Sequence, residues 1–212
     1  MPDGARIGPN AVLQHLPVLD EAIGTDYRTA LLYCAGIDEP PADAGMLPEE
    51  GVGRLHHAVR LYLPVQAPAI QRAAGLGTGD YILANRIPAL AQRLIRALPA
   101  PLGARLLSAA IAKHAWTFAG SGAFTIVAHR PLTFEIAANP LAPGAAASPC
   151  CHWHAAVFER LFSTLVWPGV KVTETACCAC GAPACRFELR PRPPAGCKDE
   201  FTLAGRDTVR QN

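Results

Sequence analysis

The sequence predicts an α+β fold, in which N-terminal helices pack on a small antiparallel sheet and a Cys-rich metal-binding hairpin follows near the C-terminal end. Helical periodicity of apolar residues fills the first 120 residues and changes to strand-like alternation after Gly122. Seven of the eight cysteines lie at or after Cys150. We expect one domain over residues 1–190, helical over 1–120, with the sheet and the metal hairpin over 121–190. A Pro-rich, disordered tail is expected over residues 191–212.

Apolar residues at helical spacing place several helices in the first 120 residues. Pro9 can occupy the first turn of one helix, and Pro17 is expected to end or kink it. The strongest pattern covers residues 86–98, where Leu90 and Leu94 belong to an apolar stripe while the arginines face away. This pattern predicts an amphipathic helix whose apolar stripe is buried.

Alternating residues predict four strands in the C-terminal part of the chain. The first two form a pair with Arg130-Pro131 at the turn, and the last two form a hairpin that carries cysteines. A helix over residues 151–166, stopped by Trp167-Pro168-Gly169, separates the two pairs. The predicted strands are Ala123–His129, Leu132–Ala137, Val170–Glu174 and Ala184–Arg190.

Charge and cysteine usage narrow the class of protein. The 19 Lys+Arg residues nearly balance the 17 Asp+Glu residues and are scattered, which disfavours a nucleic-acid-binding protein. No secretory h-region and no run of 18 apolar residues is visible, so we expect a cytoplasmic protein without a transmembrane segment, able to lie at the periphery of a membrane. Disulfides do not persist in that compartment, so clustered cysteines indicate metal or redox chemistry. Cys34, which follows an apolar stretch, is interpreted as a small buried hydrophobe.

Four residues from separate elements are candidate ligands of a structural zinc ion: Cys151, Glu174, Cys177 and Cys185. A helix start, a strand end and a hairpin connection can converge on one point, and three thiolates with one carboxylate suit tetrahedral zinc. Because protein groups would fill all four positions, the predicted role is structural. A helix N-terminus also favours the Cys151 thiolate.

Neighbouring cysteines leave alternatives open. Cys177 and Cys180 form a C-x-x-C step, so the ligands can instead be Cys177, Cys180, Cys185 and one of Cys150 or Cys151. The simplest alternative is a Cys-rich loop with free thiols, Cys178 among them, and no metal. The spacing matches none of the ferredoxin patterns, which disfavours an iron–sulfur cluster.

Three stretches resemble the 4-vinyl reductase domain family: Cys151-His152-Trp153, residues 170–177 and residues 181–187. This family includes the aromatic-sensing domains of phenol-responsive transcription activators, and its fold is similar to that of TRAPP vesicle-tethering subunits. In the sensing domains three Cys and one Glu hold a zinc, and these map onto Cys151, Glu174, Cys177 and Cys185.

Further stretches look like the bacteriochlorophyll branch of this family. They are residues 5–10, residues 79–82, residues 85–88 and residues 115–122, so the resemblance covers about residues 5–190. It implies a role in bacteriochlorophyll biosynthesis on a divinyl protochlorophyllide-type tetrapyrrole, whose 8-vinyl group (4-vinyl in older nomenclature) is reduced to ethyl. The chlorophyll precursor, a magnesium tetrapyrrole, would then be the ligand or substrate. Other pigment-biosynthesis enzymes are expected partners, and the family resemblance implies a homodimer.

The residues themselves do not show how a vinyl group would be reduced. The Gly-rich stretch over residues 75–80 lacks the G-x-G-x-x-G pattern and follows a helical segment, so it does not predict a nucleotide site. His114, on a predicted helical stripe with Leu107, Ile111 and Phe118, is a candidate magnesium ligand, with Trp116 beside it in a tetrapyrrole pocket. The alternative is that both belong to the core.

Three functions therefore stay open at this point. The first is a pigment-pathway protein, acting as a reductase, a substrate carrier or an accessory subunit. The second is a small-molecule sensing module of the aromatic-sensing kind. The third, a scaffold or assembly module, rests on fold analogy alone.

Overall fold

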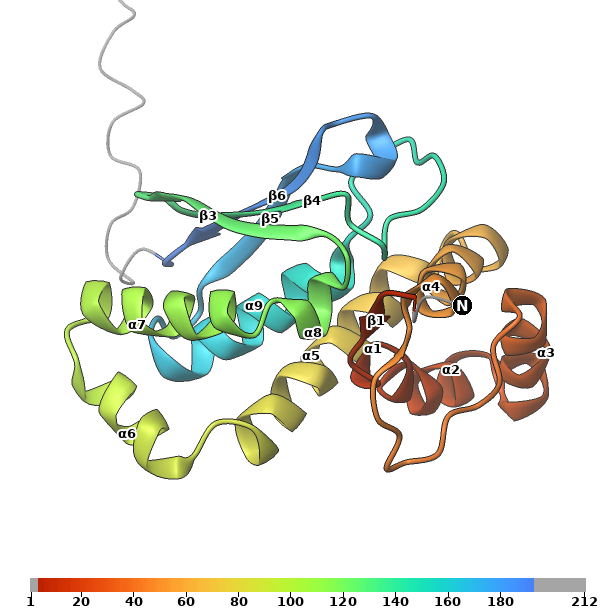
Figure 1. Ribbon diagram of the computed structural model, residues 1–212, viewed down its shortest axis with the longest axis horizontal. Coiled ribbons are helices and arrows are strands. Elements are labelled where there is room, and N and C mark those ends of the chain that lie inside the picture. Colours follow the sequence, from red (N-terminus) through yellow and green to blue (C-terminus); the bar gives the residue numbers. More distant parts are fainter. Residues whose placement is uncertain (1–3, 193–212) are drawn as a thin grey trace, which may run out of the picture.

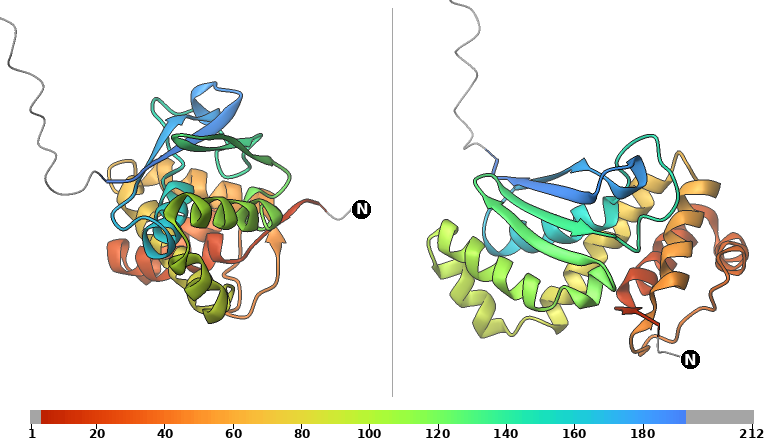
Figure 2. Two further views of the ribbon diagram at one scale, coloured as in Figure 1. Left: turned by 90° about the vertical axis from the view of Figure 1, so that its left-hand side faces the viewer. Right: turned by 45° about the horizontal axis from the view of Figure 1, so that its top comes forward.

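The computed structural model describes residues 4–192 and has helices on one face of a four-stranded antiparallel sheet (Figures 1 and 2). The predicted α+β class, with helices and a small antiparallel sheet, is confirmed. The expected tail lies, apart from residues 191 and 192, outside the described residues. No helix within residues 4–192 combines the length and apolar character that crossing a bilayer requires.

The N-terminal half is a group of helices, of which the first three follow one another closely and the fourth comes after a long loop over residues 36–46. Gly24, which has a positive φ, separates the second helix from the third, and Gly36, which also has a positive φ, ends the third helix. A short two-stranded pairing fixes the N-terminus beside the start of the fourth helix. The elements are β1 (Arg6–Ile7), α1 (Asn10–Leu13), α2 (His15–Ile23), α3 (Thr25–Ala35), β2 (Leu47–Pro48) and α4 (Glu49–Tyr62).

A long helix, α5 (Ala67–Asn85), connects this group to the sheet half of the molecule (Figure 1). The Gly-rich stretch lies inside α5, where Gly75 and Gly79 face α9 (His152–Leu165). A Cβ at Gly75 would overlap the carbonyl oxygen of Trp153, and a Cβ at Gly79 would lie 2.5 Å from the Cβ of Arg160. These glycines let the two helices approach closely, so helix packing accounts for the Gly-rich stretch.

The sheet has the strand order β3-β4-β6-β5. Its strands are β3 (Ala123–His129), β4 (Leu132–Ala137), β5 (Lys171–Ala176) and β6 (Ala184–Arg190). The structure has three of the four predicted strands at their predicted bounds and shifts the fourth from 170–174 to 171–176. The central strands supply the core: Phe134 of β4 pairs with Phe187 of β6, and both rings contact Phe158 of α9 at centroid distances of 5.2 and 5.5 Å.

The remaining helices are α6 (Ala89–Ala97), α7 (Ala100–Lys113) and α8 (Trp116–Ala119), with a single 3-10 turn, η1 (Cys178–Cys180), after β5. Figure 2 shows α7 and α9 side by side beneath the sheet. With α6, α7 forms the part of the molecule farthest from the N-terminal helices (Figure 1).

The expected end or kink at Pro17 is present: the helix breaks at Gln14, so that Pro17 lies in the first turn of α2, where its missing N–H is tolerated. Two other expectations about local structure were wrong. Cys34, which belongs to α3, is exposed and not buried. The expected buried stripe of residues 86–98 is only partly buried: Ile95 is covered, but Leu90 and Leu94 are 78% and 56% exposed.

Candidate metal centre

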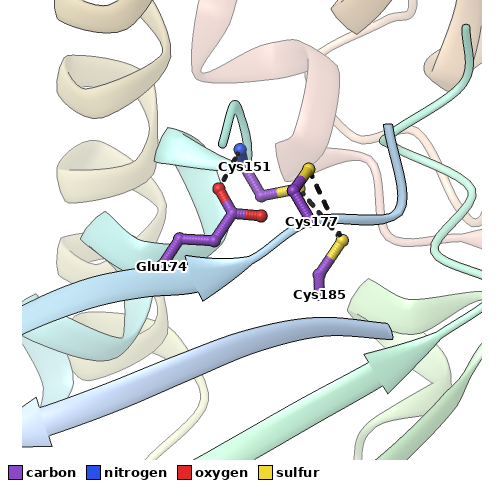
Figure 3. Close-up of side chains that lie close together, drawn as sticks. All are labelled: Cys151, Glu174, Cys177 and Cys185. Carbon is purple, nitrogen blue, oxygen red and sulfur yellow. Dashed lines mark hydrogen bonds between the residues drawn. The ribbon is translucent and has the colours of Figure 1, made fainter. Parts of the chain in front are cut away.

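A cluster of three thiols and one carboxyl group lies where β5, β6 and the start of α9 meet (Figure 3). Cys151 directly precedes α9, Glu174 is on β5, Cys177 follows β5, and Cys185 is on β6. The four potential ligand atoms all lie within 4.8 Å of one another. The structure thus brings together the four residues proposed from the sequence.

Local backbone geometry explains this convergence. The pairing of β5 with β6 shifts register between Glu174 and Ala176, so the chain bends away from regular alternation as it approaches Cys177. The backbone N–H groups of Cys180 and Ala182 both donate to the Cys177 carbonyl oxygen, at 3.0 and 3.1 Å, and Gly181 takes the left-handed conformation there. This tight turn returns the chain so that Cys185 faces Cys177.

The sulfur–sulfur distances match those of a tetrahedral zinc site. With Zn–S bonds of about 2.3 Å, tetrahedral geometry separates two sulfur ligands by about 3.8 Å. The Sγ of Cys151 lies 3.9 Å from that of Cys177 and 3.4 Å from that of Cys185, and the Sγ atoms of Cys177 and Cys185 are 4.0 Å apart. The three thiols therefore need little movement to bind one ion.

Surrounding N–H groups donate toward the cluster. The Nδ2 of Asn139 lies 3.4 Å from the Sγ of Cys151 and 3.5 Å from that of Cys185, and the backbone N–H of Cys178 lies 3.3 Å from the latter. Donors aimed at sulfur stabilise thiolates, the form that binds metal. No sign of the role of Asn139, which lies just after β4, is present in the sequence, because no local pattern shows that a polar residue at a strand end will face distant cysteines.

Glu174 has one satisfied and one unsatisfied oxygen. Its Oε2 accepts a hydrogen bond of 2.7 Å from the backbone N–H of Cys151, whereas its Oε1 is buried without a hydrogen-bond partner. A buried oxygen left without a partner is costly, and a cation bound at Oε1 would remove that cost. The orphaned oxygen is thus a second feature, besides the sulfur spacing, that suits a metal ion.

The electrostatics of the cluster favour a bound cation as well. Burial raises the pKa of Glu174 to about 8, against the lowering effect of the Cys151 backbone N–H. Hydrogen bonding with Cys150, then with Cys177 and Cys185, raises the pKa of Cys151 well above that of an ordinary thiol. Hydrogen bonds from the other thiols lower the pKa of Cys177, so the negative charge concentrates there. Metal binding at this cluster would therefore displace protons.

The structure separates the remaining cysteines from this group. Cys180 of the C-x-x-C step is exposed and stands outside the cluster of ligand atoms. The Sγ of Cys150 lies 3.8 Å from that of Cys177, so Cys150 contacts the cluster from one side. Cys178 is half-buried, and its Sγ lies 3.8 Å from the Ile136 carbonyl oxygen. The geometry favours the Glu-containing ligand set over the set with Cys180.

The two residues proposed for a tetrapyrrole pocket lie elsewhere, after the end of α7. His114 is exposed, and its Nδ1 lies 2.9 Å from the carbonyl oxygen of Ala110. Trp116 is 56% exposed. Neither residue lines either of the two depressions described next, so their role in pigment binding stays a prediction.

Two depressions on the described surface are candidate ligand sites. The larger, about 560 Å³, lies between α5, α6 and α9 and is lined by Leu83, Ile87 and Pro88 together with Arg86 and Arg96. The smaller, about 300 Å³, adjoins the Cys/Glu cluster, with His57, Arg60, Cys150 and His152 in its wall. The larger volume lies within the range of small-molecule sites.

Three buried histidines form a further group that sequence reasoning did not single out. His15 stacks edge-on against His56 at a centroid distance of 4.6 Å, and His154 lies on the far side of Trp153. Burial lowers the pKa of His15 and of His154 to about 4. The Ala11 carbonyl oxygen accepts a hydrogen bond of 3.1 Å from the Nε2 of His56. The same oxygen lies near His15 but is not placed to accept a hydrogen bond from it, so both ring nitrogens of His15 lack a partner.

Comparison with known proteins gives a family match that covers the Cys/Glu cluster and a relative that is similar over most of the chain. A family model of the 4-vinyl reductase domain matches residues 132–191, which include all four residues of the Cys/Glu cluster. The bacteriochlorophyll synthase 23 kDa chain of Cereibacter sphaeroides is 64% identical over 188 residues, covering 88% of this chain and 91% of that protein. The chain belongs to the 4-vinyl reductase domain family. The resemblance seen in the sequence is therefore confirmed, and the matched segment contains β4, α9 and the cysteine hairpin.

Solved structures share the fold of this 4-vinyl reductase domain protein at low sequence identity. The phenol-responsive sensory domain of the transcription activator PoxR, crystallised with phenol, gives a TM-score of 0.52 at 17% identity and covers 77% of this chain and 89% of that one. An Fe(II) unliganded H-NOX protein from K. algicida gives a TM-score of 0.54 at 9% identity and covers 89% and 98%. At these identities the similarity concerns the fold alone.

Proposed function

We propose that this protein acts in bacteriochlorophyll biosynthesis, where it binds a divinyl protochlorophyllide-type tetrapyrrole whose 8-vinyl group is to be reduced. The observation that carries this proposal is the 64% identity, over most of both chains, to a protein named as one chain of a bacteriochlorophyll synthase. That name also supports other pigment-biosynthesis enzymes as partners.

The reduction of a vinyl group requires two electrons and two protons, and the donor would be a separate protein or a supplied reductant. In this proposal the chain holds and presents the pigment, as a carrier or accessory subunit. A reductase activity of its own is the stronger form of the same proposal.

The Cys/Glu cluster is proposed to hold a structural zinc ion. The sulfur spacing and the orphaned Oε1 of Glu174 support this proposal, and the complete burial of Cys177 and Cys185 leaves little room for a reacting molecule. Bound there, the ion would fasten β5 and β6 to the start of α9, so that its binding energy becomes folding energy.

Two positions are proposed for the pigment, and they predict different variants. If the sequence-predicted pocket is right, His114 supplies the magnesium ligand and Trp116 a stacking surface. If the depression between α5, α6 and α9 holds the pigment, Arg96 lies at its wall and can pair with the propionate. His114→Gln with Trp116→Leu tests the first position, and Arg96→Gln tests the second.

The decisive experiment is a titration with divinyl protochlorophyllide followed by absorption spectroscopy. Binding predicts a shifted absorption band that saturates at a fixed ratio of pigment to protein, and the variant that weakens it locates the site. Addition of a reductant, followed by chromatography of the pigment, separates a reductase, which yields the ethyl product, from a carrier. A protein that leaves the spectrum unchanged is not a pigment-binding protein.

The shared fold with a phenol-responsive domain provides a second candidate, a sensing module for small aromatic molecules. The same titration with phenol in place of the pigment distinguishes the two functions. Saturable binding of phenol with no binding of the tetrapyrrole would favour the sensor.

A further inference from the structure

The helices α6 and α7 expose large aliphatic side chains to solvent. Leu90 and Leu94 of α6 are 78% and 56% exposed, and Leu102 and Leu106 of α7 are 50% and 42% exposed. Each pair is spaced by four residues, so each forms a stripe on one helix face. The two helices follow each other in the chain and form one edge of the molecule (Figures 1 and 2).

These exposed leucines do not lie on the faces by which α6 and α7 pack against the rest of the protein. The α6–α7 contact uses Ile95 and Gly103, where a Cβ at Gly103 would lie 3.1 Å from the Ile95 carbonyl oxygen. Leu107 and Ile111, on the inner face of α7, are buried. The exposed leucines therefore form a second, outward apolar face on an already amphipathic pair of helices.

The segment that contains the exposed leucines carries a net positive charge. Residues 81–134, which contain α6, α7 and β3, carry six Lys+Arg residues and no Asp or Glu. The rest of the chain carries the other 13 Lys+Arg residues against all 17 Asp+Glu residues. The nearly neutral sequence thus has one basic segment, whereas the remaining sequence is net negative.

Three of these cations are available to an external anion. Within residues 4–192, no ion pair is formed by Arg93 of α6 or by Arg105 and Lys113 of α7, and all three are exposed. In helical projection Arg93 borders the Leu90–Leu94 stripe, and Lys113 lies on the same face as Leu106, seven residues away. On each of the two neighbouring helices, exposed aliphatic residues therefore lie beside an unpaired cation.

We propose that this α6–α7 surface docks on a bilayer that contains anionic lipids. Helices that lie in a membrane interface combine an apolar face with flanking basic residues, because the leucines enter the acyl boundary while the cations meet the headgroups. A second copy of the chain is a poorer partner, since a two-fold contact would bring like charges together. The surface holds the protein at the membrane interface.

The test is flotation of the purified, full-length protein with two kinds of vesicle: phosphatidylcholine alone, and phosphatidylcholine mixed with phosphatidylglycerol. We expect binding to the mixed vesicles only, weakening as salt is added. The triple variant Arg93→Gln/Arg105→Gln/Lys113→Gln should bind about 100-fold more weakly, at about fivefold for each charge. Leu94→Ser/Leu106→Ser should weaken binding about tenfold or more.

Matched controls lie outside the surface. Leu61, 58% exposed on α4, and Lys171, an exposed lysine of β5, give Leu61→Ser and Lys171→Gln, which should leave vesicle binding unchanged. Because all these side chains are exposed, the variants should fold, and circular dichroism checks that they do.

Three results would overturn the proposal. The first is no binding of the native chain to the anionic vesicles. The second is loss of binding in the charge variant with full binding in the leucine variant, which is the behaviour expected of a site for an acidic protein. The third is a dimer in solution that Leu94→Ser/Leu106→Ser dissociates, because the surface would then join two copies. No pigment is present in this test, so its failure leaves the tetrapyrrole proposal standing.

Discussion

Replacing Glu174 by Gln should change stability in opposite directions with and without zinc. In the metal-free folded protein, burial raises the pKa of Glu174 to about 8 from the ordinary value of 4.5. The folded state therefore holds a proton that the unfolded state has lost between these two values. The stabilising contribution is complete below pH 4.5 and is lost as the pH rises through 8.

The size of the effect follows from this difference. At pH 7 the folded, metal-free protein keeps Glu174 protonated about 2.5 pH units above its ordinary pKa, which costs about 3 kcal/mol, or about 2 kcal/mol for a carboxyl that is partly exposed. Glutamine has the same shape, still accepts the Cys151 N–H and carries no charge. Glu174→Gln should therefore stabilise the metal-free protein at pH 7 by about 2 kcal/mol.

Zinc should reverse the order of the two proteins. The native chain gains stability from the ion, whereas Glu174→Gln loses an anionic ligand and gains less. Urea unfolding of both proteins, in chelator and in zinc, measures the four unfolding free energies that this comparison needs, and repeating it at pH 5 and pH 7 gives their pH dependence. Identical pH dependence of both proteins in chelator, together with equal stabilisation by zinc, would refute the assignment of Glu174 as a ligand.

Five further substitutions test the cluster, a buried histidine and the contact between α5 and α9. Cys177→Ser and Cys185→Ser should each lower zinc content, solubility and Tm together, and a loss of about 3 kcal/mol in unfolding free energy corresponds to a fall in Tm of about 10 °C. Replacing the exposed Cys180 by Ser is the control, and an unchanged Tm and zinc content in both cluster variants would contradict the structural metal. Asn139→Ala should weaken zinc binding about 10- to 100-fold in competition with a chromogenic chelator, because two sulfurs lose a donor; equal affinity would assign Asn139 to the loop alone. His15→Leu should raise stability at pH 5 by about 2 kcal/mol relative to pH 8. The reason is that the lowered pKa of His15 makes the folded state lose stability as pH falls from 6.5 toward 4, and parallel pH profiles of variant and native chain would contradict this. Gly75→Ala should destabilise the protein by about 1–3 kcal/mol in thermal unfolding, because the new methyl group would overlap the Trp153 carbonyl oxygen. Gly45→Ala is the control and should have little effect, because the space around Gly45 is open, and equal Tm values for the two variants would show that α5 and α9 can separate freely.

The sequence by itself determined the fold class and most strand bounds, and it named the four members of the cluster as one of two possible sets. Strands such as Ala123–His129 were predictable because alternation of apolar residues reflects which side of a sheet is covered, and that information is local. The four residues could be proposed as ligands because thiols and one carboxylate at the ends of neighbouring elements are a donor set that suits zinc.

Only the tertiary structure decided which side chains surround the candidate ligands and which faces remain exposed. Asn139 lies near Cys185 because β4, which ends two residues before it, pairs with β6, and the exclusion of Cys180 depends on the direction of a single turn. Leu90 and Leu94 show the same limit. Their spacing indicates an apolar helix face, but whether protein, another molecule or solvent lies against that face depends on the packing of distant segments, which no local pattern records.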